Sequence, residues 1–411
     1  MFDSMSARTS AFTPRLAPTL QAAQVLLAAV RPSAYARTRN AIDGAVTGLS
    51  PYITHGLLNL PEVLAEVDRK HALDVQHKLV FELGWRAYFR HVWQHRGDGI
   101  LWSLREGPLP ESAYATELPA DIRTGCTGVP AIDAAVRTLY ATGTLHNHAR
   151  MWLASYVVHL RKVHWRVGAD WLYGHLLDGD LASNHLSWQW VAGTGSSKPY
   201  LFNADNVARY APPDWHSPGS GIDTSYEELD RVCRSLRGRL LLSPSAGPAV
   251  AEPVLGHLPP VHPGLRPPDA ALVDGRDVWL VHPWSLGALP ADLPPDTVVV
   301  GLWLDDFYRA WAWSPTRWAF VQTRMATLAP VQWHASAEQL APVLAGARSV
   351  RSVDEPHLAP WLPRLAECRA APTLFPGVER RCDSFSQWWN RVTRGLHSAA
   401  ELLALPRTAA W

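Results

Sequence analysis

The chain has 411 residues, of which 18% are charged and 47% hydrophobic, and its formal net charge is +1. A chain of this length can bury a large core and predicts two domains. No apolar run is long enough to span a membrane, so we expect a cytoplasmic protein with no membrane partner. The balanced charge excludes a protein that is basic over its whole surface, so an interface with nucleic acid must be a local patch.

The cysteines predict neither a disulfide framework nor a metal site. They are widely scattered, with no C-x-x-C pair and no histidine at the spacing of a metal ligand: Cys126, Cys233, Cys368 and Cys382. A reduced protein with no bound metal is the simplest interpretation.

The first part of the chain reads as helical. A helix is expected over about residues 19–31, and the turn Thr47–Pro51 leads into another helix. Small hydroxyl residues at a helix N-terminus, beside exposed backbone N–H groups, can bind a phosphate. A Ser-Pro pair is also an ordinary helix cap, so the residues alone leave both interpretations open.

A longer helix is predicted over residues 80–95. It places Glu82, Trp85, Arg86 and Phe89 on one stripe. A charged Glu and Arg on an apolar stripe are costly unless they pair with each other at i,i+4 spacing or line a cavity. Both arrangements are open at this point.

The stretch from Thr144 to Trp190 predicts two walls of a pocket. Its first part places Asn147, Arg150 and Met151 on one face of a helix, at i, i+3 and i+4. A later helix repeats the pattern at four-residue steps, with Asp180, Asn184 and Trp188. The segment Asp178–Asp180 can form the acidic N-terminal turn of that second helix.

The last third of the chain changes character. Eight prolines between Leu241 and Asp269 predict an extended linker, residues 241–270. Short apolar runs then read as strands, at residues 277–284, 297–306, 330–335 and 349–356, and stretches between and after them read as helices, at 314–329, 336–346 and 357–367. This alternation predicts a smaller α/β domain with a mainly parallel sheet over residues 271–411.

Three motifs, ELGWRAYFRH, GVPAIDAAVRTLYATGTLHNHARM and DGDLASNHLSWQWVAGTG, resemble the flavin-binding domain of the DNA photolyase and cryptochrome family. The resemblance covers roughly residues 30–212. It implies an α-helical FAD-binding domain over residues 1–240, followed by the smaller α/β domain. Photolyases ordinarily carry an α/β domain before the flavin domain, so residues 271–411 are either a relocated antenna-like domain in a permuted order or an unrelated domain. The sequence does not identify a second, antenna chromophore.

The resemblance implies which residues hold FAD. The set includes contacts to both the phosphates and the flavin ring: Tyr35, Thr47, Leu49, Ser50, Arg86, Asn147, Arg150, Asp178, Asp180 and Asn184. The Asn184 amide would face flavin N5, where it favours the reduced cofactor. The chain departs from the family pattern at Gly48, where an Arg is usual, and at Thr144, where a Trp is usual.

The resemblance also implies a pocket for a base lifted out of a DNA duplex. Glu82 and Asn147 would hydrogen-bond the edges of the flipped bases, and three apolar residues would pack against them: Trp85, Met151 and Trp190. Trp188 and Trp165 match the inner and middle members of the family's electron chain. The outer tryptophan is missing, and Tyr114 lies nearest to its expected place.

Together these features predict a deoxyribodipyrimidine photolyase-like lyase, driven by blue light, that acts on DNA containing cyclobutane pyrimidine dimers. The alternative is a cryptochrome-like photoreceptor that signals through flavin redox change to a protein partner the sequence does not identify. A general flavoprotein oxidoreductase is a third interpretation, but the chain lacks a nicotinamide fingerprint. Lys198 and Arg209, beside the pocket mouth, are either DNA phosphate contacts or ordinary exposed charges.

Overall fold

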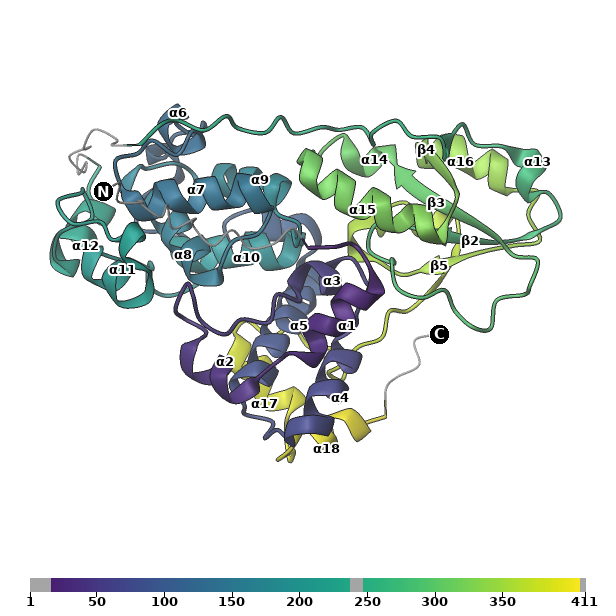
Figure 1. The fold of residues 1–411 in the computed structure, drawn as a ribbon, viewed down its shortest axis with the longest axis horizontal. Coiled ribbons are helices and arrows are strands. Elements are labelled where there is room, and N and C mark those ends of the chain that lie inside the picture. The colour runs from purple at the N-terminus through teal and green to yellow at the C-terminus, as the bar shows by residue number, and fades with distance from the viewer. Residues whose placement is uncertain (1–15, 237–246, 407–411) are drawn as a thin grey trace, which may run out of the picture.

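The computed structural model describes residues 16–236 and 247–406. The first residues of the expected helical domain, the start of the expected linker and the last five residues lie outside the described residues. Helices fill one side of the molecule, and a sheet flanked by helices fills the other (Figure 1). Among the described residues, none of the helices combines the length and the apolar character needed to cross a membrane.

The N-terminal helices begin and end at recognisable signals. The helix expected at 19–31 spans Leu20–Ala28, and Thr19 caps it by accepting a hydrogen bond from the Ala22 amide. A reciprocal capping box joins Asn59 and Glu62 at the start of α4. The bounds of this group are α1 Leu20–Ala28, α2 Pro32–Thr38, α3 Ser50–Thr54, α4 Leu60–His71 and α5 Lys78–Arg96.

The central helices also begin and end at recognisable signals. The α7 helix ends at Gly143, whose φ of 68° suits glycine, and the carboxylate of Asp180 caps α10 by accepting from the Ser183 amide. The predicted acidic start of that helix is therefore confirmed. The bounds are α6 Ala120–Arg123, α7 Pro130–Thr142, α8 Asn147–Ser155, α9 Trp165–His175, α10 Leu181–Ala192, α11 Ala204–Tyr210 and α12 Tyr226–Arg234, with short turns at Gly97–Leu101, Glu111–Ala113, Tyr156–Leu160 and Pro213–Trp215.

The second half of the chain forms a six-stranded parallel sheet in the order β1-β4-β3-β2-β5-β6. All four predicted strands are present, and the expected mainly parallel α/β fold is confirmed. The strands are β1 Leu265–Arg266, β2 Asp277–Val281, β3 Val298–Leu304, β4 Val331–Ala335, β5 Ser349–Val353 and β6 Glu367–Arg369. The helices among them are α13 Ala270–Val273, α14 Asp305–Tyr308, α15 Pro315–Leu328 and α16 Ala337–Leu344.

One predicted helix of this domain is wrong. Residues 357–367 form two short 3-10 turns, Pro356–Leu358 and Leu362–Arg364, in place of one helix. Pro360 and Pro363 explain the difference, because a proline inside a helix removes a backbone hydrogen bond and clashes with the preceding turn. The edge strands β1 and β6 were not predicted, since two or three residues carry too little periodicity to be seen.

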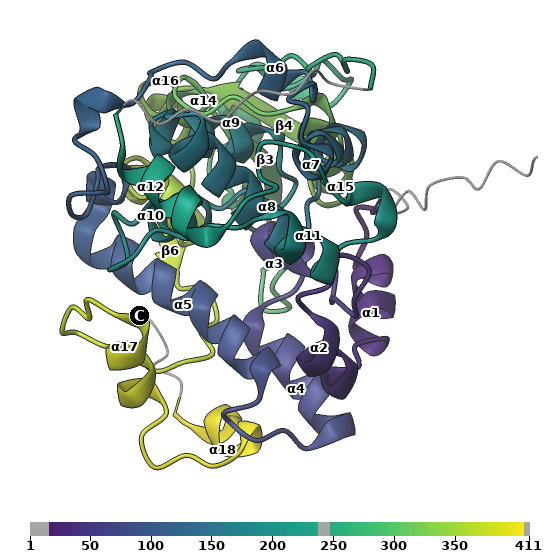
Figure 2. The ribbon, with the colours of Figure 1, turned by 90° about the vertical axis from the view of Figure 1, so that its left-hand side faces the viewer.

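The chain returns to the helical region at its end. After β6, the helices α17 (Phe385–Val392) and α18 (Ala399–Ala404) pack beside α5 and α4, as both ribbon views show (Figures 1 and 2). Phe81 of α5 lies 4.6 Å from Phe385 and 5.0 Å from Trp389, centroid to centroid. The last segment therefore belongs to the packing around α5.

Two hydrophobic clusters form the core. The larger one joins residues of α1–α5 to the sheet and to α17, while the smaller one fills the space among α7–α12. The division into residues 1–240, 241–270 and 271–411 stays a prediction: it follows the change from helices to sheet, whereas apolar packing continues across it. Residues 247–264 contain no helix or strand and run over the surface (Figure 1), where Val254 and Val261 are exposed.

Candidate functional site

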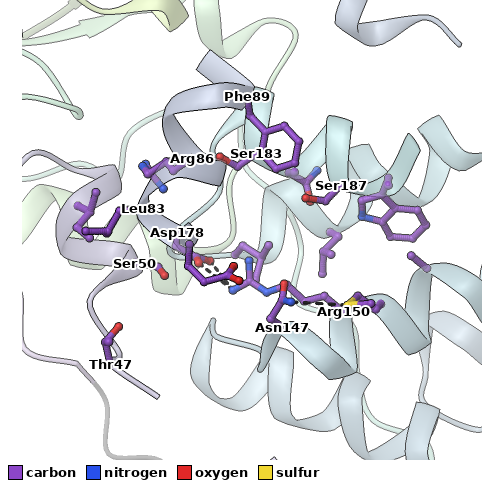
Figure 3. Close-up of a pocket in the computed structure, with 18 of the residues that line it drawn as sticks. Thr47, Ser50, Leu83, Arg86, Phe89, Asn147, Arg150, Asp178, Ser183 and Ser187 are labelled. Atoms are coloured by element: carbon purple, nitrogen blue, oxygen red, sulfur yellow. Dashed lines mark hydrogen bonds and ion pairs between the residues drawn. The ribbon is translucent and has the colours of Figure 1, made fainter. Parts of the chain in front are cut away.

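A cavity of about 280 Å³ lies between α5, α8, α9 and α10, with α3 and the segment before it closing one end (Figure 3). Its volume is near the lower end of the range for small-molecule pockets. Hydroxyl, guanidinium, carboxylate and amide groups share its wall with apolar side chains. This mixture is typical of a site that orients a large polar ligand around an aromatic group.

Most of the predicted site residues meet in this cavity. The structure brings together side chains from five separate segments that the sequence analysis had assigned to FAD or to a substrate: Tyr35, Thr47, Ser50, Glu82, Arg86, Asn147, Arg150, Met151, Asp178, Asn184 and Trp188. Their individual roles stay predictions. The separate motifs predicted one shared site, and these side chains lie in one cavity.

An ion pair fixes one wall of the cavity. Nη2 of Arg150 donates to both carboxylate oxygens of Asp178, at 2.9 and 2.8 Å, and its Nε donates to the Leu145 carbonyl oxygen at 2.8 Å. Charge-assisted hydrogen bonds of this kind hold both groups in place. In Figure 3 the pair spans the cavity wall next to Asn147.

The structure decides between the two open arrangements of Glu82 and Arg86. Glu82 accepts a 2.6 Å hydrogen bond from Nη1 of Arg39, a residue that follows α2. Arg86 instead donates to the Thr54 hydroxyl at 2.9 Å and approaches Asp180 at 3.8 Å. The intrahelical pair is therefore wrong, and Glu82 and Arg86 both line the cavity.

Burial changes the acidity of this corner. Burial raises the pKa of Glu82, and the neighbouring Arg39 only partly opposes that effect. Burial and the nearby Glu82 carboxylate raise the pKa of Tyr35 to about 12. The carboxyl group of Glu82 is thus more easily protonated than an exposed one, which suits a group that exchanges hydrogen bonds with a ligand.

The walls formed by α8 and α10 present amides to the cavity. The Asn184 amide nitrogen donates to the Ala169 carbonyl oxygen at 2.8 Å, which fixes the orientation of that side chain. The Asn147 amide nitrogen lies 3.6 Å from the sulfur of Met151. Trp188 is buried, and its ring packs so tightly on α9 that a β-carbon at Gly168 would lie 2.4 Å from it.

Five predicted site residues lie outside the cavity lining. Trp85 stacks on Phe385, with ring centroids 4.0 Å apart and an interplanar angle of 12°. Trp190 is 40% exposed, with its ring 5.9 Å from that of Tyr200. Leu49, Asp180 and Trp165 are buried behind the wall.

Trp165 connects to the surface through other rings. Its indole nitrogen donates to the Ser103 hydroxyl at 2.9 Å. The His164 ring lies 5.7 Å from Trp165 and 6.3 Å from Tyr114, centroid to centroid. The His164 ring therefore lies between Tyr114 and Trp165, and the role of Tyr114 as the outer member of the electron chain stays a prediction.

Sequence reasoning missed part of the cavity wall. Leu83 and Phe89 of α5 and Ser183 and Ser187 of α10 also line it, and all four are labelled in Figure 3. Ser187 stands three residues after Asn184, so helical spacing could have identified it. His146 stands directly before α8 and caps that helix by accepting a hydrogen bond from the His148 amide.

A comparison with known families gives one match. Residues 79–214 match the profile described as the FAD binding domain of DNA photolyase. The matched stretch contains α5 and α7–α11, which supply most of the cavity wall. FAD is therefore the cofactor of this region.

The residues of the cavity fit FAD. Ser183 lines it with a buried hydroxyl that has no partner among the described residues, and a buried hydroxyl of this kind needs a ligand or water. Arg86 and Arg150 supply positive charge, and the hydroxyls of Thr47 and Ser50 stand near the start of α3. These groups suit a pyrophosphate, while the amides and apolar side chains suit a flavin ring.

The chain also resembles individual proteins. It is 34% identical over 192 residues to a cryptochrome DASH of Gloeobacter violaceus, covering 44% of this chain and 38% of that protein. It is 37% identical over 152 residues to a deoxyribodipyrimidine photo-lyase of Streptomyces griseus, covering 37% and 33%.

Among solved structures, the cryptochrome of Synechocystis sp. PCC6803 gives a TM-score of 0.41 at 28% identity, covering 46% of this chain and 43% of that one. The matches to the two curated relatives span 38% and 33% of those proteins, about a third of their length. The motifs, the profile and these relatives show that the region around residues 79–214 is similar to the FAD-binding domain of the DNA photolyase and cryptochrome family.

Proposed function

We propose that this protein is a blue-light-driven flavoenzyme that splits cyclobutane pyrimidine dimers in DNA. The observation that supports it most is the convergence of Glu82, Asn147 and Met151 in the cavity that also contains Asn184 and the Arg150–Asp178 pair. These groups offer hydrogen bonds and an apolar contact to an extruded base beside the proposed flavin position. When bound and reduced, FAD supplies the photoexcited electron for the dimer.

The chain's own residues would bind and orient the substrate. Glu82 and Asn147 hydrogen-bond the edges of the flipped bases, and Met151 packs against their apolar side. Arg39 holds the Glu82 carboxylate at 2.6 Å, so Glu82 reaches the substrate already oriented. Flipping a damaged base costs less than flipping an intact one, which contributes selectivity.

The electron supply would run through buried rings. Trp188 borders the cavity, and Trp165 lies on the neighbouring helix α9. Tyr114, beside His164, is the proposed outer member. Dimer splitting is redox-neutral, because the split dimer returns the donated electron. Electrons along this path would therefore serve to reduce FAD that has become oxidised.

A second candidate, a cryptochrome-like photoreceptor, is favoured by two observations. Trp85 stacks on Phe385 of the C-terminal segment, so one face of its ring is already covered. Cryptochrome DASH relatives also match at an identity similar to that of the photolyases. A photoreceptor needs the flavin but not the base pocket.

Dimer reversal by the purified protein tests the proposal. An oligonucleotide with one thymine dimer is illuminated with blue light in the presence of wild-type protein, and dimers are counted by chromatography. Glu82→Ala, which leaves the Arg150–Asp178 pair intact, should retain FAD and lose most of the reversal. A wild type that contains FAD and leaves the dimers intact would support the photoreceptor.

A further inference from the structure

The segment that carries Asp178 is held from both sides of the molecule. We define the flavin loop as Leu176–Asp180, between α9 and α10. Its residues are almost entirely buried. The position of the Asp178 carboxylate, and hence of Arg150, depends on the backbone of this loop.

Three consecutive carbonyl oxygens of the flavin loop have side-chain partners. Nε2 of His55 lies 2.8 Å from the Leu177 oxygen, and the Thr54 hydroxyl donates to the Asp178 oxygen at 3.2 Å. Both partners stand at the end of α3, in the helical region. The third oxygen, that of Gly179, accepts a 2.6 Å hydrogen bond from Nη2 of Arg317. Arg317 lies on α15 and so comes from the α/β domain.

Arg317 is an unusual residue to find in a core. Its side chain is fully buried, and among the described residues no carboxylate lies within ion-pair distance of it. Its Nη1 donates to the Tyr173 carbonyl oxygen at 3.1 Å, and its guanidinium lies 4.0 Å from the centre of the Trp313 ring. Two carbonyl dipoles and aromatic faces thus take the place of a counter-ion, which is a costly arrangement for a buried charge.

Close packing at Gly179 shows how tightly Arg317 holds the loop. A β-carbon at this position would lie 2.4 Å from Nη1 of Arg317 and 2.8 Å from the Tyr173 carbonyl oxygen. Only glycine permits that approach. The loop therefore combines two acidic side chains with a glycine that lets the guanidinium approach its backbone closely.

The α/β domain makes further contacts to the start of α10. The Leu181 amide donates to Nε2 of His357 at 3.2 Å. Arg90 bridges Asp180 and Glu355, with its nitrogens 2.9 and 3.1 Å from the two carboxylates. His357 and Glu355 follow β5, so they stand at the carboxyl end of the parallel sheet.

That end of the sheet is where open α/β folds bind their ligands. The strand order reverses between β2 and β5, and the crevice outside their carboxyl ends is the usual ligand position. Here the helical region fills it. Nδ1 of His55 lies 2.6 Å from the Pro283 oxygen just beyond β2, and Trp93 packs against His357 beyond β5.

We infer that the α/β domain acts as a clamp on the flavin loop, in which Arg317 is a positioning residue for FAD binding. Arg317 fixes the peptide after Asp178, Asp178 fixes Arg150, and Arg150 forms the cavity wall. At the switch point of the sheet, the helical region occupies the crevice in which other open α/β folds bind a small ligand. This contact supports the clamp. The inference rests on FAD as the cofactor.

Two variants of the full chain and a matched control test the clamp. Arg317→Met removes both carbonyl contacts while keeping much of the side-chain volume, and Arg317→Lys keeps the charge with one donor group. Arg324→Met is the control: Arg324 lies on the same helix and also donates to two carbonyl oxygens, those of Leu286 and Gly287, at 2.9 and 3.1 Å. It does not contact the flavin loop.

The readouts are the FAD dissociation constant and amide hydrogen exchange in the protein without FAD. We expect Arg317→Met to weaken FAD binding about tenfold and to speed exchange at Leu177, Gly179 and Leu181, while the amides of β3 keep their protection. Arg317→Lys should recover part of both. Arg324→Met should match the wild type.

Several results would overturn the inference. One is an Arg317→Met protein with the FAD affinity and exchange of the wild type. Another is exchange that rises equally in β3 and the flavin loop in both Arg317 variants, which would make Arg317 an ordinary core residue. A wild type that binds no FAD would refute the flavin assignment instead, and the exchange measurement would still decide whether the loop is clamped.

Discussion

The ring of Trp85 lies 4.0 Å from the ring of Phe385 and nearly parallel to it, although 300 residues separate them in the chain. The contact joins the predicted pocket helix α5 to the C-terminal segment. Phe385 is buried. Trp85 thus packs against the core through Phe385, while its neighbours on the same stripe, Glu82 and Arg86, line the cavity.

Phe385→Ala should destabilise the whole protein. Removing a buried phenylalanine typically costs about 3–5 kcal/mol, because apolar contacts are lost and a cavity remains. Urea unfolding measures the change. Trp102→Ala is a suitable control, since Trp102 is 73% exposed and should lose no more than about 0.5 kcal/mol. Equal losses in the two variants would show that α17 does not pack on α5 in solution.

Asp178→Ala or Arg150→Ala should weaken FAD retention. Each leaves a charged partner without its hydrogen bonds and frees the cavity wall, so the affinity for FAD should fall at least about tenfold. Bound flavin is measured by absorbance after refolding with excess FAD. Arg231→Ala breaks an exposed pair with Glu228 on α12 and should retain FAD fully. Wild-type retention in the Asp178 and Arg150 variants would contradict the assigned site.

Part of this site was predictable because its signals are local. The Asp180 cap, the Asn147–Met151 face and the four parallel strands each depend on residues close together in the sequence. Helical and strand periodicity record such relationships.

The partners of the charged residues were not predictable. Arg39 pairs with Glu82 across 43 residues, and Arg90 bonds Glu355 across 265. Spacing within one helix suggested the nearest opposite charge, Arg86, whereas tertiary packing supplied Arg39. Trp85 was assigned to the pocket because it shares a motif and a helix stripe with Glu82, but its ring stacks on Phe385, a residue 300 positions further along the chain.

The pair formed by Arg90 and Glu355 should make stability depend on pH. Burial alone would raise the pKa of Glu355, but Arg90 and His357 outweigh it and hold the pKa at about 2, below the ordinary 4.5. Because the pKa of Glu355 in the folded protein lies below its unfolded value, the ionised carboxylate stabilises the fold at pH values above 4.5. This stability is lost as the pH falls from 4.5 toward 2.

Glu355→Gln tests this dependence. At about pH 6 the substitution should lower the free energy of unfolding by about 3 kcal/mol, because Arg90 loses the negative charge of its partner. At about pH 3 the free energy of unfolding should fall by clearly less. Unfolding in urea at the two pH values measures both differences. Glu338→Gln, at an exposed position on α16, should change little at either pH. A deficit in Glu355→Gln that stays constant with pH would contradict the role given to the carboxylate.

Trp188→Phe should abolish light-driven reduction of oxidised FAD. Phenylalanine is far harder to oxidise than indole, and Trp188 is the tryptophan that borders the cavity. Absorbance under blue light with an external reductant follows the reaction. Trp215→Phe, a buried tryptophan outside the cavity lining, should behave as the wild type. Unchanged reduction in Trp188→Phe would show that electrons take another path.

Trp190→Ala should weaken binding to damaged DNA without affecting FAD. Trp190 is 40% exposed beside Tyr200, so its removal leaves no core cavity. Stacking of a base on an aromatic ring contributes roughly 1–3 kcal/mol, which corresponds to a loss of about tenfold or more in affinity. Titration with dimer-containing and undamaged oligonucleotides at fixed salt separates stacking from phosphate contacts. An equal, small loss for both DNAs would exclude Trp190 from the lesion contact.

The most direct test of the proposed repair activity is dimer reversal by the wild-type protein, with stoichiometric reduced FAD, under blue light and in darkness. The account predicts loss of cyclobutane dimers and recovery of intact pyrimidines in the light alone. Dimers that persist in the light, in a protein shown by its absorbance to hold reduced FAD, would contradict it.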